Sequence, residues 1–276
     1  MTSKLSAKAH VLLTLAITVL FFLPLYLVLV NIFKPTDTII ANPLSLPFQF
    51  TFDNLMAVLT RPDHLIYTSM WNSIVITGIS LIVVILSSSM VAYYIVRNDS
   101  KKTRLLLVFF LFGLMVPTTI ILIPVVKVLV ALHLMSTKAG LIIFYMGYYI
   151  PFGIFMYTGF IRTIPRELDE AASIDGASNL RTFWQIIFPL LGPCTSSVII
   201  FIGLWVWNDF LNPLIIIGPV KGTTITAGIY RVIGQYSVDW GQMFAMMFLA
   251  SLPIIILYLA LQKQFVEGIT SGSLKG

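Results

Sequence analysis

The sequence predicts an all-α, polytopic membrane protein with six transmembrane helices and a helix-turn-helix loop between the fourth and the fifth. Of its 276 residues, 58% are hydrophobic and only 10% are charged, whereas about 25% are charged in a typical soluble domain. Six apolar runs are each about as long as the roughly 20 residues that a helix needs to cross a bilayer. These runs do not alternate polar and apolar residues, so they indicate helices rather than barrel strands.

The six predicted spans belong to one transmembrane domain that covers residues 1–276. They cover about residues 11–33, 73–96, 105–126, 139–161, 188–210 and 241–262. The first follows Lys4 and Lys8 and superficially resembles a secretory signal, but it is too long for a cleaved signal and no small-residue cleavage site follows it. We therefore interpret it as a span.

The distribution of the 17 Lys and Arg residues predicts the orientation. Positive charges close to a span are retained on the cytoplasmic side, and Arg97, Lys101, Lys102 and Arg104 all lie in one turn between the second and third spans. We expect this turn, both termini and the tail 263–276 to be cytoplasmic. A basic patch of this kind can also bind nucleic acid or anionic lipid, but between two spans a topology anchor is the favoured interpretation.

Two segments on the opposite side are long enough to have structure of their own, Lys34–Met70 and Gly218–Trp240. In the first, an extended stretch is expected before a short helix that begins at Asp53. The single cysteine, Cys194, is expected to be a buried small side chain. The three histidines are too scattered to predict a metal site.

The cytoplasmic loop 162–188 holds four of the eleven acidic residues and is predicted to form two short helices. The first begins near Pro165, carries Glu167 and Glu170 in its first turns and stops at Gly176, because Pro favours helix starts and Gly favours helix ends. Ser178 is expected to cap the second. That helix would place Leu180, Phe183 and Ile187 on one face and end before Pro189.

The loop offers small and acidic residues that another protein could approach closely. They are Glu167, Glu170, Ala171, Ala172, Asp175, Gly176 and Ala177. Such a surface suits a docking site for a protein with basic residues. An amphipathic helix at the membrane interface with a solvated acidic face would have the same pattern, and the residues alone leave both interpretations open.

The order Glu170-Ala-Ala, three residues, Gly176, nine residues, Ile186-x-Phe-Pro189 resembles the EAA loop of binding-protein-dependent ABC importer permeases. Phe188 stands where that family usually has Leu. Further stretches resemble the carbohydrate branch, similar to its smaller six-span permease subunit. They include Phe33-Lys-Pro35, Ile174-Asp-Gly-Ala177, Trp207-Asn-Asp-Phe210 and the tail Phe265–Gly276.

The resemblance implies that the loop is a coupling helix seated in a cleft of an ATPase, where Glu170 meets a basic residue. It also implies two ATPase subunits, a second and distinct permease subunit, and an extracytoplasmic solute-binding protein that touches the segment 218–240. The chain has no Gly-x-x-x-x-Gly-Lys-[Ser/Thr] motif, so ATP and Mg²⁺ are expected in the partner ATPases and no cofactor is expected on this chain.

A polar cluster ends the fifth span and is the candidate solute path. It consists of Trp205, Asn208, Asp209 and Asn212. An ionisable group at membrane depth usually faces a cavity or a partner, and indole rings beside amides suit a hydroxyl-rich sugar. Because Asp209 lies at the end of the apolar run, where charges and Trp residues also occur without function, a structural role at the interface is the favoured interpretation.

The sequence therefore predicts a permease subunit that moves a sugar or oligosaccharide by alternating access, driven by partner ATPases. The alternative is an ion-coupled secondary transporter of a small polar solute, which would normally carry ionisable residues near the midplane of its spans. The apolar runs contain no Asp, Glu, Lys or Arg if the fifth is taken only as far as Trp207, before Asp209. An enzyme is not expected, because no constellation of nucleophile, base or metal ligands can be assembled.

Overall fold

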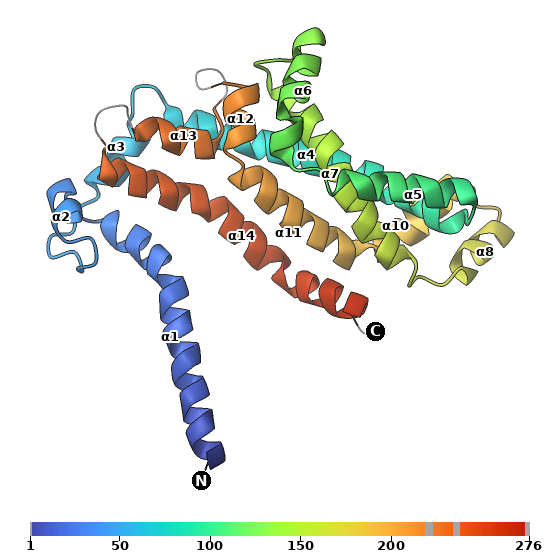
Figure 1. Ribbon diagram of the computed structural model, residues 1–276, viewed down its shortest axis with the longest axis horizontal. Coiled ribbons are helices and arrows are strands. Elements are labelled where there is room, and N and C mark those ends of the chain that lie inside the picture. The colour runs from blue at the N-terminus through green and yellow to red at the C-terminus, as the bar shows by residue number, and fades with distance from the viewer. Residues whose placement is uncertain (1, 219–222, 234–237, 274–276) are drawn as a thin grey trace. The chain divides into compact units, whose positions relative to one another are not determined.

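The computed structural model describes residues 2–218, 223–233 and 238–273, and within these residues every regular element is a helix (Figure 1). The chain divides into two units, described here separately: residues 1–67 with 228–252, and residues 68–227 with 253–276. The helices are α1 (Thr2–Asn31), α2 (Thr36–Ala41), α3 (Asp53–Leu59), α4 (Leu65–Arg97), α5 (Lys101–Gly113), α6 (Thr118–Ala131), α7 (Lys138–Ile161), α8 (Glu167–Ile174), α9 (Asn179–Thr182), α10 (Phe188–Leu190), α11 (Gly192–Asn208), α12 (Leu211–Ile216), α13 (Ile225–Val232) and α14 (Trp240–Ser273), and a π-helical turn covers Phe183–Ile187.

Four helices in the described part of the chain are long and apolar enough to cross a membrane: α1, α4, α7 and α14. Two further spans are obtained if each of two sharply bent helix pairs is counted as one, so the total reaches six. The pairs are α5 with α6, bent by 101°, and the helical segment 179–190 with α11, bent by 74°. The chain is thus a multi-pass, all-helical membrane protein.

The expected third span, 105–126, is not one straight helix. It is interrupted between Gly113 and Thr118. Pro117 lies directly before α6 with ψ 139°, and its ring disfavours helical geometry at Val116. The bend therefore follows from the proline, although the apolar run itself passes through it without a change in composition.

The fifth span begins later than expected. We expected the second loop helix to end before Pro189, but the helical path continues to Leu190 and the break falls at Leu191, before Gly192. Pro189 lacks the N–H of a regular helix, and the turn directly before it is a π turn. Such a turn adds a residue and so rotates the preceding side chains by about 100°.

This rotation corrects the expected face of the second loop helix. Phe183 and Ile187 are buried, as expected, but Leu180 is 58% exposed. Leu180 precedes the π turn, so the regular 3.6-residue period used in the prediction does not hold across it. The other local features of the loop follow the expectation: α8 starts two residues after Pro165, Gly176 has φ +77°, and the Ser178 side chain caps α9.

In the first unit, the chain after α1 folds around a buried lysine. Lys34 is fully buried, and its Nζ donates to the Asn31 side chain and to the carbonyls of Asn42 and Pro43, each at 3.1 Å. Burial lowers the pKa of Lys34. The expected short helix at Asp53 is present as α3, and its Asn54 amide donates to the Lys34 carbonyl at 2.7 Å.

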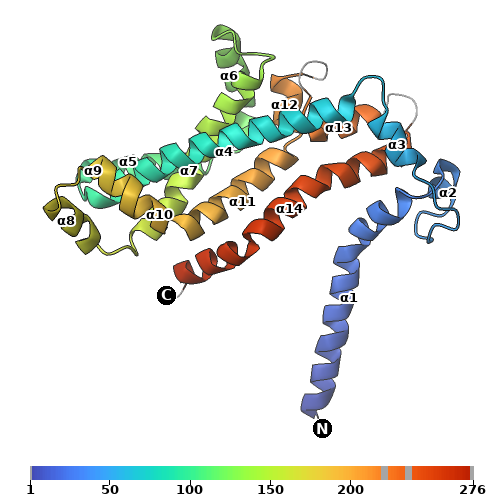
Figure 2. The ribbon, with the colours of Figure 1, turned by 180° about the vertical axis from the view of Figure 1, so that it is seen from behind.

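In the second unit, α7 is the central helix and packs against α5, α6, α11 and α12. A close approach joins α7 to α4, because a Cβ at Gly153 would collide with the Ser88 side chain. Small residues of this kind let membrane helices pack at short distance. Figure 2 shows that α8 and α9 lie at the same end of this unit as the start of α5.

Two expectations fall partly outside the described residues. The segment 218–240 contains α13 and the start of α14, while residues 219–222 and 234–237 are not described. The tail expected from 263 onward is helical to Ser273 as part of α14, and residues 274–276 are not described. Cys194 is buried, as expected.

Candidate functional site

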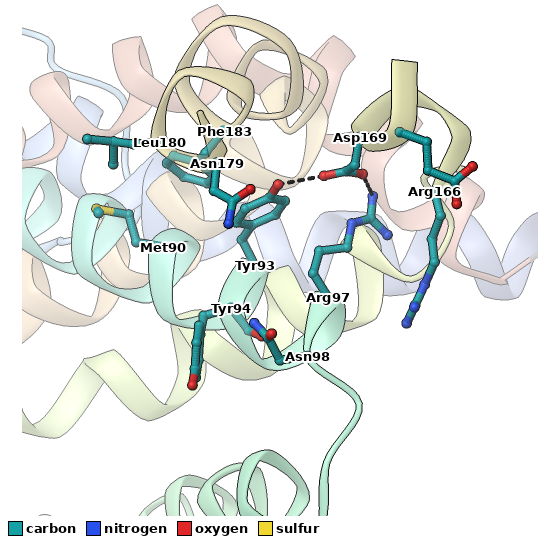
Figure 3. A pocket seen from close by; sticks show the side chains of 11 residues that line it. Met90, Tyr93, Tyr94, Arg97, Asn98, Arg166, Asp169, Asn179, Leu180 and Phe183 are labelled. Atoms are coloured by element: carbon teal, nitrogen blue, oxygen red, sulfur yellow. Dashed lines mark hydrogen bonds and ion pairs between the residues drawn. The ribbon is translucent and has the colours of Figure 1, made fainter. Parts of the chain in front are cut away.

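The acidic helix α8 is held onto the end of α4 by one of its own carboxylates. Asp169 forms an ion pair with Arg97 at 2.8 Å and accepts a hydrogen bond from the Tyr93 hydroxyl at 2.5 Å (Figure 3). Arg97 also donates to the Ile164 carbonyl, at 3.3 Å. Both charged side chains are at most 20% exposed, so this contact is a partly buried attachment rather than a surface pair.

The residues predicted for docking lie around this attachment and mostly face outward. Exposed members are Glu167, Glu170, Ala171, Asp175 and Gly176, whereas Ala177 is half-buried and Ala172 is only 4% exposed. Ala172 thus belongs to the packed side of α8. The exposed acidic side chains and the small residues beside them leave a surface that another protein can contact.

A cleft of about 530 Å³ opens beside the attachment, between α8, α9 and the last turns of α4. Figure 3 shows the side chains that line it, including Asp169, Arg97 and Tyr93. Glu170 also lines this cleft, and Leu180 adds an exposed apolar side chain. The cleft therefore combines carboxylate, guanidinium and apolar surface within reach of one docked side chain.

The four residues of the candidate solute path meet in a second hollow. Trp205, Asn208, Asp209 and Asn212 all line a groove of about 830 Å³ between α5, α6, α7, α11 and α12. Aromatic side chains form much of its wall, namely Tyr148, Tyr149, Phe152 and Phe155. Such a groove offers ring faces and polar groups side by side, which are the two surfaces that a sugar ring contacts.

Asp209 ends α11 and is surrounded by neutral donors. Its Oδ2 accepts from the Tyr145 hydroxyl at 2.9 Å and from Asn212 Nδ2 at 2.7 Å, and Oδ1 faces the Asn212 N–H at 3.3 Å. The Thr226 hydroxyl donates to its backbone carbonyl at 2.6 Å. These contacts orient the carboxyl group at the edge of the groove.

The aromatic wall is packed into a fixed shape. Trp205 stacks on Tyr149, with ring centroids 5.7 Å apart and an interplanar angle of 20°, and meets Phe152 edge-on at 4.7 Å. Trp205 nevertheless remains 41% exposed. Part of the indole surface is therefore held in place by its neighbours while another part stays open to a ligand.

Four residues of these two sites were not selected from the sequence as site residues. Asp169 was one of several carboxylates in an acidic turn, Arg97 was assigned to topology, and Tyr93 and Tyr145 lie in uniformly apolar spans. Tyr93 is 76 residues from Asp169, and Tyr145 is 64 residues from Asp209. At these separations a single sequence does not show that the residues are in contact. The one local feature that could have indicated a site is a tyrosine hydroxyl within an otherwise apolar span.

Comparisons with known proteins identify relatives of this chain. The chain is 33% identical over 261 residues, 95% of this chain and 94% of the relative, to the probable starch degradation products transport system permease protein AmyC of Thermoanaerobacterium thermosulfurigenes. It is 37% identical over 270 residues, 96% of each chain, to the multiple sugar-binding transport system permease protein MsmG of Streptococcus mutans.

A solved structure shares the fold. It belongs to a bacterial ABC transporter involved in the import of the acidic polysaccharide alginate, with a TM-score of 0.79, 18% identity, and coverage of 96% of this chain and 98% of that one. Residues 85–271, which contain both α8 and the groove, match a single family. The chain belongs to the binding-protein-dependent transport system inner membrane components, the permease subunits of ABC importers.

Proposed function

We propose that this chain is the permease subunit of a carbohydrate importer and moves a sugar or oligosaccharide across a prokaryotic cell membrane by alternating access. Support comes from relatives named for starch degradation products and for multiple sugars, each aligned over nearly its whole length. The family assignment disfavours an ion-coupled transporter. Two ATPase subunits that bind ATP and Mg²⁺, a second and distinct permease and an extracytoplasmic solute-binding protein complete the importer.

The observation that carries the coupling role is the attachment of α8 to α4. An ATPase that contacts the exposed side of α8 at Glu170 displaces a helix already joined to α4 through Asp169 and Arg97, 2.8 Å apart. Because α4 is a single helix of 33 residues, about 50 Å long, motion at the loop reaches the opposite end of the span. The loop lies in the cytoplasm in this arrangement, together with both termini.

The groove at the end of α11 is the proposed solute path of this subunit. Trp205 supplies an open ring face, and Asn208 and Asp209 supply polar groups beside it. Sugar hydroxyls donate hydrogen bonds to a carboxylate, and such charge-assisted bonds are stronger than neutral ones. Rocking of the bundle would open and close this hollow to each side of the membrane.

Charge reversal at Glu170 tests the coupling role. We expect Glu170→Lys to reduce both co-purification of the ATPase subunits and ATP-driven uptake in proteoliposomes, while the purified permease keeps its helical circular dichroism spectrum. The matched control is Asp37→Lys, which reverses an exposed carboxylate at the start of α2. Normal ATPase binding and normal uptake in Glu170→Lys would show that the docking role is wrong.

A further inference from the structure

A second, more basic groove lies on the other side of the start of α8. It has a volume of about 780 Å³ and is formed by the end of α4, the turn 98–100, the first turns of α5, the end of α7 and residues 162–167. Four arginines line it: Arg97, Arg104, Arg162 and Arg166. The carboxylates in its lining are Asp99 and Glu167, so the groove has a net positive charge.

Two of these arginines are already neutralised and two are available. Arg97 is paired with Asp169 at 2.8 Å, and Arg104 is paired with Asp99 at 2.9 Å. Arg166 donates one hydrogen bond to the Val96 carbonyl at 3.1 Å, which positions its guanidinium and leaves its other N–H groups for a ligand. Arg162 and Arg166 are both exposed.

The arginines of the groove act electrostatically on Asp99, one of its two carboxylates. The pKa of Asp99 is held below its usual value, first by the hydrogen bond from Arg104 and to a smaller extent by the charges of Arg166 and Arg162. Three guanidinium groups thus act on one point in the turn. A second anion would be attracted by the same arginines but repelled by Asp99, so the place for it in the groove is beside Arg162 and Arg166.

Next to the basic groove, α5 presents an apolar face toward its surroundings. Leu105, Phe109 and Phe112 are 71%, 69% and 63% exposed, and their spacing of four and three residues places them on one side of the helix. Arg104 and Leu107 of the same helix line the groove. At about 100° of rotation per residue, Arg104 and Leu107 lie on a different side of α5 from Leu105, Phe109 and Phe112. The two sides meet at Val108, which is 44% exposed and follows Arg104 by one turn. The groove therefore reaches the exposed hydrocarbon-compatible surface of this bent span along Arg104 and Val108.

We propose that this groove binds the phosphate headgroup of an anionic phospholipid, with Arg162 and Arg166 as its main ligands and the acyl chains along the exposed face of α5. Basic pockets between membrane helices on the cytoplasmic side suit such headgroups. A soluble phosphate offers the same charge but would leave the apolar face of α5 unused, which favours the lipid. The bound lipid would steady the segment 162–167 from which α8 begins.

Lipid retention by the purified full-length chain tests this proposal. The protein is equilibrated in detergent with equal amounts of phosphatidylglycerol and phosphatidylcholine, and the lipids that remain bound are counted by native mass spectrometry. We expect enrichment of phosphatidylglycerol, and a loss of that enrichment by about tenfold or more in Arg162→Gln/Arg166→Gln, since each basic residue contributes to anionic lipid binding. The control Arg181→Gln/Lys263→Gln removes two exposed positive charges elsewhere and should keep the enrichment.

Three outcomes would overturn the proposal. One is equal enrichment in the groove variant and the control. Another is that inorganic phosphate displaces the bound phosphatidylglycerol as effectively as phosphatidylglycerol vesicles do, which would indicate a free-anion site. The third is loss of ATPase co-purification in the groove variant with unchanged lipid retention, which would indicate a protein-docking site. If the double variant does not fold, Arg162→Gln alone must still lower the enrichment, because that side chain is exposed.

Discussion

Two aspartates in the second unit are held in similar ways but with different partners. Asp169 and Asp209 each accept a hydrogen bond from a tyrosine hydroxyl on a neighbouring helix. Asp169 is also paired with Arg97, while the side-chain contacts of Asp209 come from Tyr145 and Asn212. One carboxyl group is therefore paired with a cation inside an attachment between helices, and the other is held by neutral donors beside an open groove.

The difference shows how one residue type can serve two purposes. A partly buried ion pair is costly to break, because the remaining charge is left without compensation, so Asp169 with Arg97 suits the transmission of force. A carboxylate held only by neutral donors can exchange some of them for ligand hydroxyls, so Asp209 suits transient binding. Variants of each site should therefore affect different measurements.

Arg97→Met should have the largest effect on stability. It leaves Asp169 partly buried without its cation, which costs about 3 kcal/mol of the free energy of unfolding. Thermal unfolding of the purified chain measures this loss. Asp169→Asn in the same background should restore part of it, because the uncompensated charge is removed. Equal stability of Arg97→Met and the native chain would mean that the attachment contributes nothing.

Asp209→Asn should have a moderate effect, and on uptake rather than on folding. The substitution keeps the size and one acceptor oxygen but removes the charge, so we expect the KM for uptake to rise about tenfold, equivalent to one charge-assisted hydrogen bond. The free energy of unfolding should fall by only about 1 kcal/mol, because the asparagine keeps one of the two acceptor oxygens. Unchanged KM in an assembled importer would assign Asp209 to the structural role at the span end.

A matched pair of tyrosine variants compares the two sites directly. Tyr93→Phe and Tyr145→Phe each remove one hydroxyl that donates to an aspartate, at a cost of about 1 kcal/mol. The loss should be larger for Tyr145→Phe, because Asp169 retains Arg97 while Asp209 loses one of few donors. Thermal unfolding of both variants side by side measures the difference, and the reverse order would contradict the comparison.

Ser178→Ala should have the smallest effect. The Ser178 side chain caps α9 through the Arg181 N–H at 3.4 Å and is exposed, so its loss should cost about 0.5 kcal/mol. This variant alters the loop without touching Asp169. If it reduced stability as much as Arg97→Met, the local structure of the loop would contribute as much to the free energy of unfolding as its attachment to α4.

The spans and the outline of the loop could be predicted because they depend on local patterns. Apolar length reveals a span, Pro165 and Gly176 delimit α8, and Ser178 marks the next start. A kink at Pro117 was expected, but its extent of 101° and the π turn before Pro189 were not predicted, since composition records that a proline is present but not how the helix adjusts to it.

The residues of the groove could be found from the sequence, but the attachment of α8 to α4 could not. The groove residues from Trp205 to Asn212 are close in sequence, so one cluster identified them. The attachment of Asp169 to Arg97 joins segments that a single sequence gives no means to pair. Exposure of Glu170 and burial of Ala172 likewise depend on which side of α8 packs, which the short helix does not reveal.

The first helix shows another kind of constraint. In the apolar stretch of α1 none of the residues is buried within the described chain, although the stretch is as hydrophobic as α4, 39% of which is buried. The effect of a substitution in α1 should therefore depend on the hydrophobicity of the new side chain, and not on whether its shape fits a cavity in the protein. Exchanges among Leu, Ile, Val and Phe should thus be freely tolerated in α1, while the same exchanges in α7 must respect the shape of its neighbours.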